Sequence, residues 1–272
     1  MKILIIGGTR FLGRHLVNSA RARGHDVTLF NRGMTNPNLF RNVDMIQGDR
    51  EKDLDQLSGQ WDAVIDTCGY FPRIVRMSAE ALKDKVDQYV FISSISVYAD
   101  FKKININESY PVGKIEDETM EQITGESYGP LKALCEKAVQ DVFGINSLII
   151  RPGLIVGPHD PTDRFTYWPV RIARGGDVLV PDNPNALTQI IDVRDLSDFI
   201  IHLVEQTYLV FSMQQVNRCN LELYLKHANR SAAAMRISNG HRLNSSIKIM
   251  LRRGVICLHG SLTQKKRKGL LA

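Results

Sequence analysis

Cysteine is scarce in this chain, and its placement excludes two common ways of stabilising a fold. The 272 residues contain only four cysteines. They are Cys68, Cys135, Cys219 and Cys257. None of them belongs to a CxxC pair or has a histidine at metal-ligand spacing, so we expect no disulfides, no structural zinc and no other bound metal.

Long hydrophobic runs are also missing. The first apolar run, residues 3–6, is four residues long and ends in glycines, and no later stretch approaches the length of a membrane span. The sequence therefore predicts neither a signal peptide nor a membrane partner, and it favours the cytoplasm. With 43% hydrophobic residues, the chain can bury one substantial core.

Acidic residues almost vanish from the last quarter of the chain. Residues 1–206 carry 23 Lys+Arg and 28 Asp+Glu, whereas residues 207–272 carry 12 and 1. The net charge therefore changes from −5 to +11 near residue 207. We divide the chain into an N-terminal domain (1–160), a segment interleaved with that domain (161–206) and a basic tail (207–272).

The N-terminal stretch reads as strand, glycine-rich turn, helix and strand. Residues 3–6 are an unbroken apolar run, typical of a parallel strand buried on both faces. Gly7 and Gly8 allow a tight turn whose backbone amides can approach a pyrophosphate, and Gly13 allows close packing of helix on strand. Residues 27–30 supply the second strand. This context predicts a bound dinucleotide, where three glycines alone would indicate only a turn.

Strands and helices continue in alternation. We expect strands at residues 45–47, 63–66, 89–92 and 147–150, and helices at 53–57, 72–86 and 128–142. Beyond residue 151, prolines mark a loop, followed by a helix (165–173), a short strand (178–180) and a helix (193–206). The pattern predicts an α/β fold with a doubly wound parallel sheet of Rossmann type. We expect residues 1–160 to form this dinucleotide-binding domain and residues 161–206 to lie close to the substrate. Right-handed crossovers place the second and third strands on one side of the first and the fourth to sixth on the other.

A tyrosine and a lysine four residues apart on a helix can perform acid–base chemistry beside a nicotinamide, because the cation favours the phenolate. The chain has three such pairs: Tyr98/Lys102, Tyr110/Lys114 and Tyr128/Lys132. The second lies in a loop with proline and glycine, and Tyr98 belongs to a turn. Only Tyr128/Lys132 opens a regular amphipathic helix, so we assign Tyr128 as the acid/base and Lys132 as the residue that lowers its pKa.

Ser94 lies just after the fifth predicted strand, at the edge of the sheet where ligands bind in such folds. Its hydroxyl can orient the reacting substrate oxygen toward the tyrosine. Position alone leaves Ser93 and Ser96 as alternatives, and a serine that only satisfies the backbone is a third.

The motifs together resemble the extended short-chain dehydrogenase/reductases of the NAD(P)-dependent epimerase/dehydratase group. The resemblance spans residues 1–206. It rests on residues 7–13, 49–50, 93–98, 128–132, 151–153, 157–158 and 191–195. In that family the serine precedes the tyrosine of a Val-Tyr pair by four residues, which selects Ser94. The resemblance implies a sugar or nucleotide-sugar substrate that is epimerised, dehydrated or reduced through hydride transfer, and it makes a homodimer possible.

The resemblance also indicates which residues hold the cofactor. They lie in the glycine turn, at the ends of the second to fourth strands, in the Tyr-Lys helix and after the sixth strand. We expect contacts from Gly7, Gly8, Thr9, Arg10, Phe11, Leu12, Gly13, Asn31, Arg32, Asp49, Arg50, Thr67, Cys68, Tyr128, Lys132 and Pro152.

Two departures from the family pattern bear on the choice of cofactor. Arg10 stands where the middle glycine of GxxGxxG is expected, and Asn31-Arg32 replace the acidic residue that holds the ribose 2′-hydroxyl of NAD. Guanidinium groups suit a 2′-phosphate. We therefore favour NADP, with NAD possible. The alternative is that Arg32 stacks on the adenine, which would serve both cofactors equally.

A GGTR-type turn is also similar to family branches that have left sugar chemistry, including chloroplast stem-loop RNA-binding proteins. RNA binding is therefore the alternative function. It requires a basic surface, and residues 1–206 carry a net charge of −5, so we expect no nucleic-acid partner for this part.

Residues 207–272 lack the sustained periodicity of a helix or strand, so the basic tail has two possible interpretations. The family resemblance implies a strand similar to Gly-x-Phe-Asn-Ala-Thr-Gly after residue 206. The codons of residues 208–215, read from their third bases, permit Gly-Ile-Phe-Asn-Ala-Thr-Gly, with the alanine forced. We hypothesise that a frameshift near residue 207 replaces the family's C-terminal region. The rival interpretation is a genuine basic tail with a cluster at residues 265–268.

Overall fold

The computed structural model describes residues 1–103, 105–179 and 189–212. Its centre is a six-stranded sheet in the order β3-β2-β1-β4-β5-β6, with every neighbouring pair parallel. The strands are β1 (Lys2–Ile6), β2 (Asp26–Asn31), β3 (Asp44–Gln47), β4 (Trp61–Asp66), β5 (Val86–Ile92) and β6 (Ser147–Ile150). The predicted placement of the strands on either side of β1 is confirmed.

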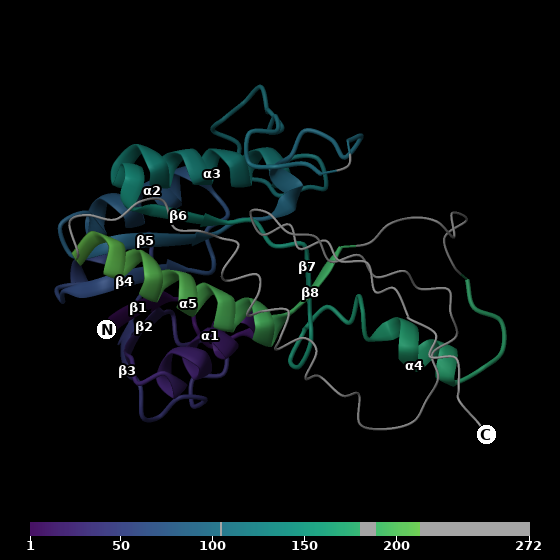
Figure 1. The fold of residues 1–272 in the computed structure, drawn as a ribbon, viewed down its shortest axis with the longest axis horizontal. Helices are drawn as coiled ribbons and strands as arrows, with labels where there is room; N and C mark the ends of the chain where they lie inside the picture. Colours follow the sequence, from purple (N-terminus) through teal and green to yellow (C-terminus); the bar gives the residue numbers. More distant parts are fainter. Residues whose placement is uncertain (104, 180–188, 213–272) are drawn as a thin grey trace, which may run out of the picture.

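Four helices cover the two faces of this sheet. Figure 1 shows α1 (Phe11–Ala22) and α5 (Val193–Ser212) side by side on one face, and α2 (Pro72–Leu82) and α3 (Tyr128–Phe143) on the other. A fifth helix, α4 (Tyr167–Ala173), lies away from the sheet. Short 3-10 turns occupy Leu54–Gln56 (η1), Ile95–Val97 (η2) and Gly144–Asn146 (η3). The Rossmann-type doubly wound fold is thus confirmed.

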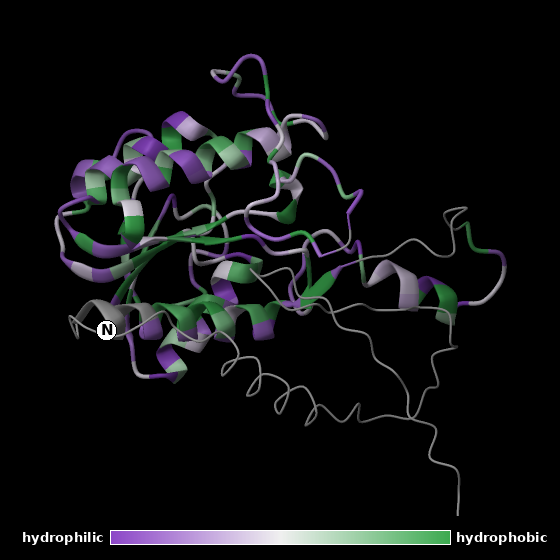
Figure 2. Cartoon of the chain, turned by 45° about the horizontal axis from the view of Figure 1, so that its top comes forward, coloured by the Kyte–Doolittle hydropathy of each residue, from purple (hydrophilic) through white to green (hydrophobic). Residues whose placement is uncertain are grey.

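The central strand shows why this sheet needs helices on both sides. Ile3 and Ile5 pack in the core under α1 and α5, whereas Leu4 and Ile6 pack in the core under α2 and α3. All four side chains are at most 1% exposed. Alternate residues of a strand point to opposite faces, so an unbroken apolar run requires two apolar layers. The strands in Figure 2 are accordingly hydrophobic, while the covering helices mix hydrophobic and hydrophilic residues.

Some predicted boundaries are wrong. The helix expected over 72–86 ends at Leu82, because Val86 already pairs with Trp61 as the first residue of β5. The loop expected after Pro152 contains β7 (Leu154–Val156), which pairs in parallel with β8 (Ile190–Asp192). Val178 and Leu179 are not in a strand, and the rest of that predicted strand lies outside the described residues.

Two further expectations concern membranes and cysteines. None of the helices in the described ranges is long and apolar enough to cross a membrane. Within the same ranges, no group of three or more histidine, cysteine or acidic side chains is arranged to hold a metal. Cys68 and Cys135 are free thiols, while Cys219 and Cys257 lie outside the described residues.

Candidate active site

The glycine turn joins β1 to α1 at the carboxyl edge of the sheet. Gly7 and Gly8 have φ values of 106° and 94°, which residues with a Cβ rarely adopt. A Cβ at Gly13 would lie 2.8 Å from the backbone nitrogen and Cα of Gly8, so helix and turn touch directly. Phe11, at the first position of α1, also has a positive φ, of 36°. The turn therefore presents bare backbone at a helix N-terminus, which is an arrangement that binds phosphate.

The end of β2 fixes this turn in place. The Asn31 side chain donates to the Gly7 carbonyl at 2.8 Å and accepts from the Gly33 amide at 2.8 Å. Asn36 donates to the Thr9 carbonyl at 2.9 Å. Asn31, which we expected to contact the cofactor, is thus occupied in holding the turn. Arg32 and Arg10 are exposed at the same edge.

Of the two cofactor contacts expected after β3, Asp49 and Arg50, the side chain of Arg50 is placed differently from the expectation. Asp49 is half-buried and its carboxylate accepts from the Glu51 amide at 3.0 Å. Arg50 turns its guanidinium inward and forms an ion pair with Asp66 at 2.7 Å. Its side chain is therefore committed to the protein, which leaves only its backbone to meet a cofactor.

The end of β4 lies against the glycine turn. The Thr67 hydroxyl donates to the Ile6 carbonyl at 2.8 Å, and the Cys68 thiol lies 3.7 Å from the same oxygen. A Cβ at Gly7 would collide with the Thr67 hydroxyl. Burial raises the pKa of the Cys68 thiol, which keeps it protonated near neutral pH.

Tyr128 and Ser94 meet at the same edge. Tyr128 is the first residue of α3, and Ser94 caps η2, where its hydroxyl accepts from the Ser96 amide at 3.1 Å. Burial raises the pKa of Tyr128, and this outweighs a hydrogen bond with the Ser94 side chain that acts to lower it. The structure thus brings together the two hydroxyl groups that the sequence selected.

Lys132, one turn further along α3, is buried beneath these residues. Its ammonium donates to the Gly69 carbonyl at 2.8 Å and to the Ile92 carbonyl at 2.6 Å, and lies 4.1 Å from the centre of the Phe91 ring. Burial lowers the pKa of Lys132 to about 8. The sequence predicted that Lys132 lowers the pKa of Tyr128. In this arrangement the pKa of Tyr128 is raised, because desolvation dominates and the ammonium is bound to carbonyl groups.

The competing residues are placed differently. Ser93 is buried and Ser96 is exposed. The Tyr110 hydroxyl donates to Asp100 at 2.7 Å, in a loop rather than a helix. Tyr98 is buried next to η2. Among the three Tyr-Lys pairs, Tyr128/Lys132 is the one that a helix carries, as the periodicity predicted.

A pocket of about 620 Å³ opens beside Tyr128. Ser96, Lys114 and Glu126 contribute polar groups to its wall. Sequence reasoning weighed Lys114 only as the partner of Tyr110 and missed Glu126, because both lie in a polar loop with no periodicity. Pro152, expected near the nicotinamide, is buried, and its carbonyl accepts from the Ile95 amide at 3.0 Å.

The fold and the glycine turn define a Rossmann-type dinucleotide-binding protein. The chain belongs to the NAD dependent epimerase/dehydratase family, whose model matches residues 3–71 and 73–217.

Known proteins similar to this chain include one curated relative and several solved structures. The chloroplast stem-loop binding protein of 41 kDa b of Arabidopsis thaliana is 29% identical over 230 residues, which are 75% of this chain. The chain spans 55% of that relative's length. WbmH of Bordetella bronchiseptica, solved with NAD+, has a TM-score of 0.61 at 18% identity, covering 75% of this chain and 72% of the other. The UDP-N-acetylglucosamine 4-epimerase of Bacillus cereus has a TM-score of 0.58 at 18% identity, covering 76% and 75%.

Proposed function

We propose that this chain is a nicotinamide-dinucleotide-dependent enzyme that oxidises or reduces a hydroxyl or carbonyl group of a nucleotide-sugar-like substrate. The observation that carries the proposal is that Ser94, just after β5, and Tyr128, the first residue of α3, lie at the carboxyl edge of the sheet, with the Ser94 side chain acting to lower the pKa of the Tyr128 phenol. A pocket of about 620 Å³ adjoins Tyr128 and offers room for a small molecule. UDP-sugar epimerases are among the solved structures with this fold.

The residues at the glycine turn fit a dinucleotide. Gly7 and Gly13 leave no space for a Cβ, so only bare backbone faces the phosphate groups there. The N-terminus of α1 adds a positive potential at this place. Lys132 would hold the nicotinamide ribose only if its ammonium exchanged its bond to the Gly69 or Ile92 carbonyl for a bond to a ribose hydroxyl. A bound nicotinamide supplies or accepts the hydride.

The chain's own residues move the proton. Because its pKa is raised, the Tyr128 phenol is protonated near neutral pH and can donate to a carbonyl oxygen. The Ser94 hydroxyl, which lies near enough to act on the pKa of this phenol, is placed to orient the same oxygen. When the proton leaves Tyr128, the Ser94 side chain, which acts to lower the pKa of this phenol, stabilises the phenolate.

The experiment replaces Tyr128 by phenylalanine and measures turnover with UDP-glucose and UDP-N-acetylglucosamine. We expect turnover to fall by about 10²- to 10⁴-fold, the usual contribution of acid–base catalysis, while the Kd for the cofactor stays nearly unchanged. Tyr110→Phe is the matched control, since it removes a tyrosine hydroxyl that bonds Asp100 instead. Retained turnover in Tyr128→Phe would refute the assignment.

The cofactor is proposed to be NADP in preference to NAD. Asn31 bonds the Gly7 carbonyl and the Gly33 amide, and no carboxylate stands at that position for a ribose 2′-hydroxyl. Arg32 follows it and is exposed. Titrations with both cofactors give the two dissociation constants, and tighter binding of NAD would defeat this preference.

RNA binding is the second candidate function, favoured by the likeness to a stem-loop binding protein. Phosphate contacts make affinity fall steeply with salt. Filter binding of a stem-loop RNA across a salt series tests it. A steep slope together with no turnover on any UDP-sugar would favour this function over the enzyme.

The frameshift hypothesis remains a proposal about the tail. Its evidence lies in residues 208–215, of which 213–215 lie outside the described residues. The family match ends at residue 217, close to the place where the charge balance changes. The gene's nucleotide sequence, read in the alternative frame, would continue the family pattern if the hypothesis holds. A frame that soon meets stop codons would remove it.

A further inference from the structure

We propose that Arg50 and Asp66 form a buried clamp that positions the loops holding the cofactor. This inference rests on the proposed function, because the loops it joins are those expected to surround a dinucleotide. Neither residue contacts the cofactor through its side chain in this account. Both are positioning residues.

The pair itself has the geometry of a strong, directional ion pair. Arg50 Nη1 donates to Asp66 Oδ1 at 3.0 Å and Nη2 donates to Oδ2 at 2.7 Å. Nε and Nη2 also donate to the Ser78 hydroxyl in α2, at 3.2 and 2.9 Å. All three nitrogens of the guanidinium are therefore committed, and its planar fork fixes the direction of the side chain.

The Asp66 carboxylate also accepts several hydrogen bonds. Asp66 is 0% exposed. Besides Arg50, its oxygens accept from the Tyr89 hydroxyl at 2.9 Å and from the Cys68 amide at 3.1 Å. Burial alone would raise the pKa of Asp66, but the Arg50 charge and these hydrogen bonds hold it below its ordinary value. The group therefore stays ionised, which a buried carboxylate does only when it is fully paired.

The positions of Arg50 and Asp66 in the sheet show which strand ends the ion pair connects. Among the described strands, β3 lies at the edge of the sheet and pairs with β2 alone, and two strands separate it from β4. Arg50 follows β3, whereas Asp66 is the last residue of β4, so the ion pair spans this part of the carboxyl edge. The glycine turn lies between them, at the end of β1. The clamp thus ties the adenosine side of the predicted site to its centre.

The connection continues directly into the glycine turn. Asp66 holds the Cys68 amide, and the neighbouring Thr67 hydroxyl bonds the Ile6 carbonyl at 2.8 Å, one residue before Gly7. Gly69 in turn accepts from Lys132 at 2.8 Å. A displacement of the β4 end would therefore shift both the phosphate turn and the lysine of the catalytic helix.

The test compares Arg50→Lys with Arg76→Lys in the full chain. Arg50→Lys keeps the positive charge but loses the planar guanidinium that makes two parallel hydrogen bonds to Asp66. Arg76 is a matched control, because it pairs with Asp141 at 2.7 Å on the outer surface. The readouts are the Kd values for NAD+ and NADP+, and hydrogen exchange of the backbone amides at residues 48–53 and 67–69.

We expect Arg50→Lys to raise both Kd values by between about tenfold and 100-fold, as small misplacements of a binding group do. We also expect faster exchange at both loops, with β1 and β5 unchanged. Ser78→Ala, which removes two hydrogen bonds of Arg50 but leaves the ion pair, should show a smaller change in the same places. It also serves as the decisive variant if Arg50→Lys does not fold.

Two results would overturn the clamp. One is wild-type affinity with unchanged loop exchange, and the other is faster exchange throughout the sheet, which would indicate a general loss of stability. If the wild-type chain binds neither dinucleotide, the proposed function fails, and local exchange at the two loops still decides whether the clamp exists.

Discussion

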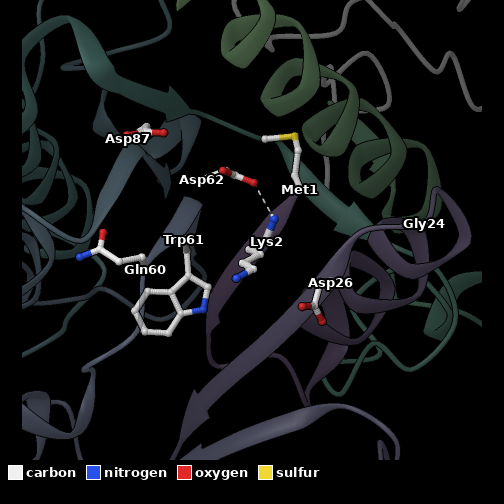
Figure 3. Close-up of a pocket in the computed structure, with 8 residues that line it drawn as sticks. All are labelled: Met1, Lys2, Gly24, Asp26, Gln60, Trp61, Asp62 and Asp87. Atoms are coloured by element: carbon white, nitrogen blue, oxygen red, sulfur yellow. Dashed lines mark hydrogen bonds between the residues drawn. The ribbon is translucent and has the colours of Figure 1, made fainter. Parts of the chain in front are cut away.

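The two edges of the same sheet carry pockets of similar volume that differ in the charge of the residues lining them. The pocket beside Tyr128 lies at the carboxyl edge, where α1 and α3 begin. A second pocket, of about 580 Å³, lies at the amino edge (Figure 3), where Asp26, Asp62 and Asp87 line it. Parallel strands with right-handed crossovers place the helix N-termini at the carboxyl edge and their C-termini at the amino edge.

This difference explains why volume alone does not locate a binding site. The amino-edge pocket offers carboxylates, one of which, Asp62, accepts from the Lys2 amide at 2.6 Å. Three carboxylates against the Met1 and Lys2 ammonium groups leave this surface net negative, which disfavours a pyrophosphate. The carboxyl edge offers bare amides at Gly7 and Gly8, exposed Arg10 and Arg32, and a proton donor. Backbone direction therefore determines which edge can bind an anionic cofactor.

The largest expected effect follows from filling the glycine turn. Gly13→Ala places a Cβ 2.8 Å from the Gly8 backbone, so turn and helix must separate. We expect the Kd for the dinucleotide to rise by more than about 100-fold, measured by calorimetric titration.

Gly24→Ala is the control for that substitution. Gly24 also has a positive φ, of 79°, but it borders the amino-edge pocket, and apart from its chain neighbours no atom of the described residues lies within 4 Å of its Cβ position. This variant should lose about 1 kcal/mol of stability and keep its cofactor affinity. Equal loss of affinity in both variants would remove the distinction between the edges.

A smaller effect is expected from pH, through Lys132. Its pKa is lowered to about 8 by burial, so its positive charge is present below that pH and is lost above it. We expect the Kd for the dinucleotide to rise by up to about tenfold between pH 7 and 9, since each unit above the pKa reduces the charged fraction about tenfold. Lys132→Met should bind weakly with no such dependence. An unchanged pH profile in that variant would assign the titration to another group.

The same pKa shift has a consequence for stability. Because the pKa of Lys132 in the folded state lies below its ordinary value of 10.5, the unfolded chain binds the proton more tightly. The contribution of Lys132 to the free energy of unfolding should therefore increase as pH rises from about 8 to 10.5. Denaturant unfolding of wild type and Lys132→Met across this range measures the contribution as a difference.

Arg32→Ala separates the two explanations of that residue. If Arg32 binds a 2′-phosphate, the affinity for NADP should fall by about tenfold or more, as expected for a charge-assisted hydrogen bond, with NAD little changed. Equal losses for both cofactors would indicate stacking on the adenine. Arg21→Ala, on the last turn of α1, is a suitable control because it removes a positive charge far from the glycine turn.

The smallest effect should come from the amino edge. Asp62→Asn removes a negative charge from that pocket and weakens its bond to the Lys2 amide. We expect a stability change of about 1 kcal/mol or less and no change in cofactor affinity. A gain in dinucleotide binding would mean that charge, rather than backbone direction, separates the two edges.

Local sequence signals predicted most of the fold and part of the site. Ile3–Ile6, the three glycines and the periodicity after Tyr128 each depend on neighbours in the chain, and the structure places them as expected. The pairing of β7 with β8 escaped prediction, because each has only three residues and the two lie far apart in sequence.

The hydrogen-bond partners of side chains were harder to predict than the helices and strands. Arg50 looked like a cofactor ligand, but its partner Asp66 is 16 residues away and is brought near only by the order of the strands. The Asn31 side chain, also expected to contact the cofactor, donates a hydrogen bond to the Gly7 carbonyl. No pattern in sequence shows which of several nearby acceptors a polar side chain will reach.

Hydrogen exchange of the wild-type chain, with and without NADP+ or NAD+, tests the central claim most directly. We expect new protection at the amides of residues 7–13 and 67–69 and none around residues 24–26 and 60–62. Protection at the amino edge, or none at the glycine turn with either cofactor at saturating concentration, would contradict it.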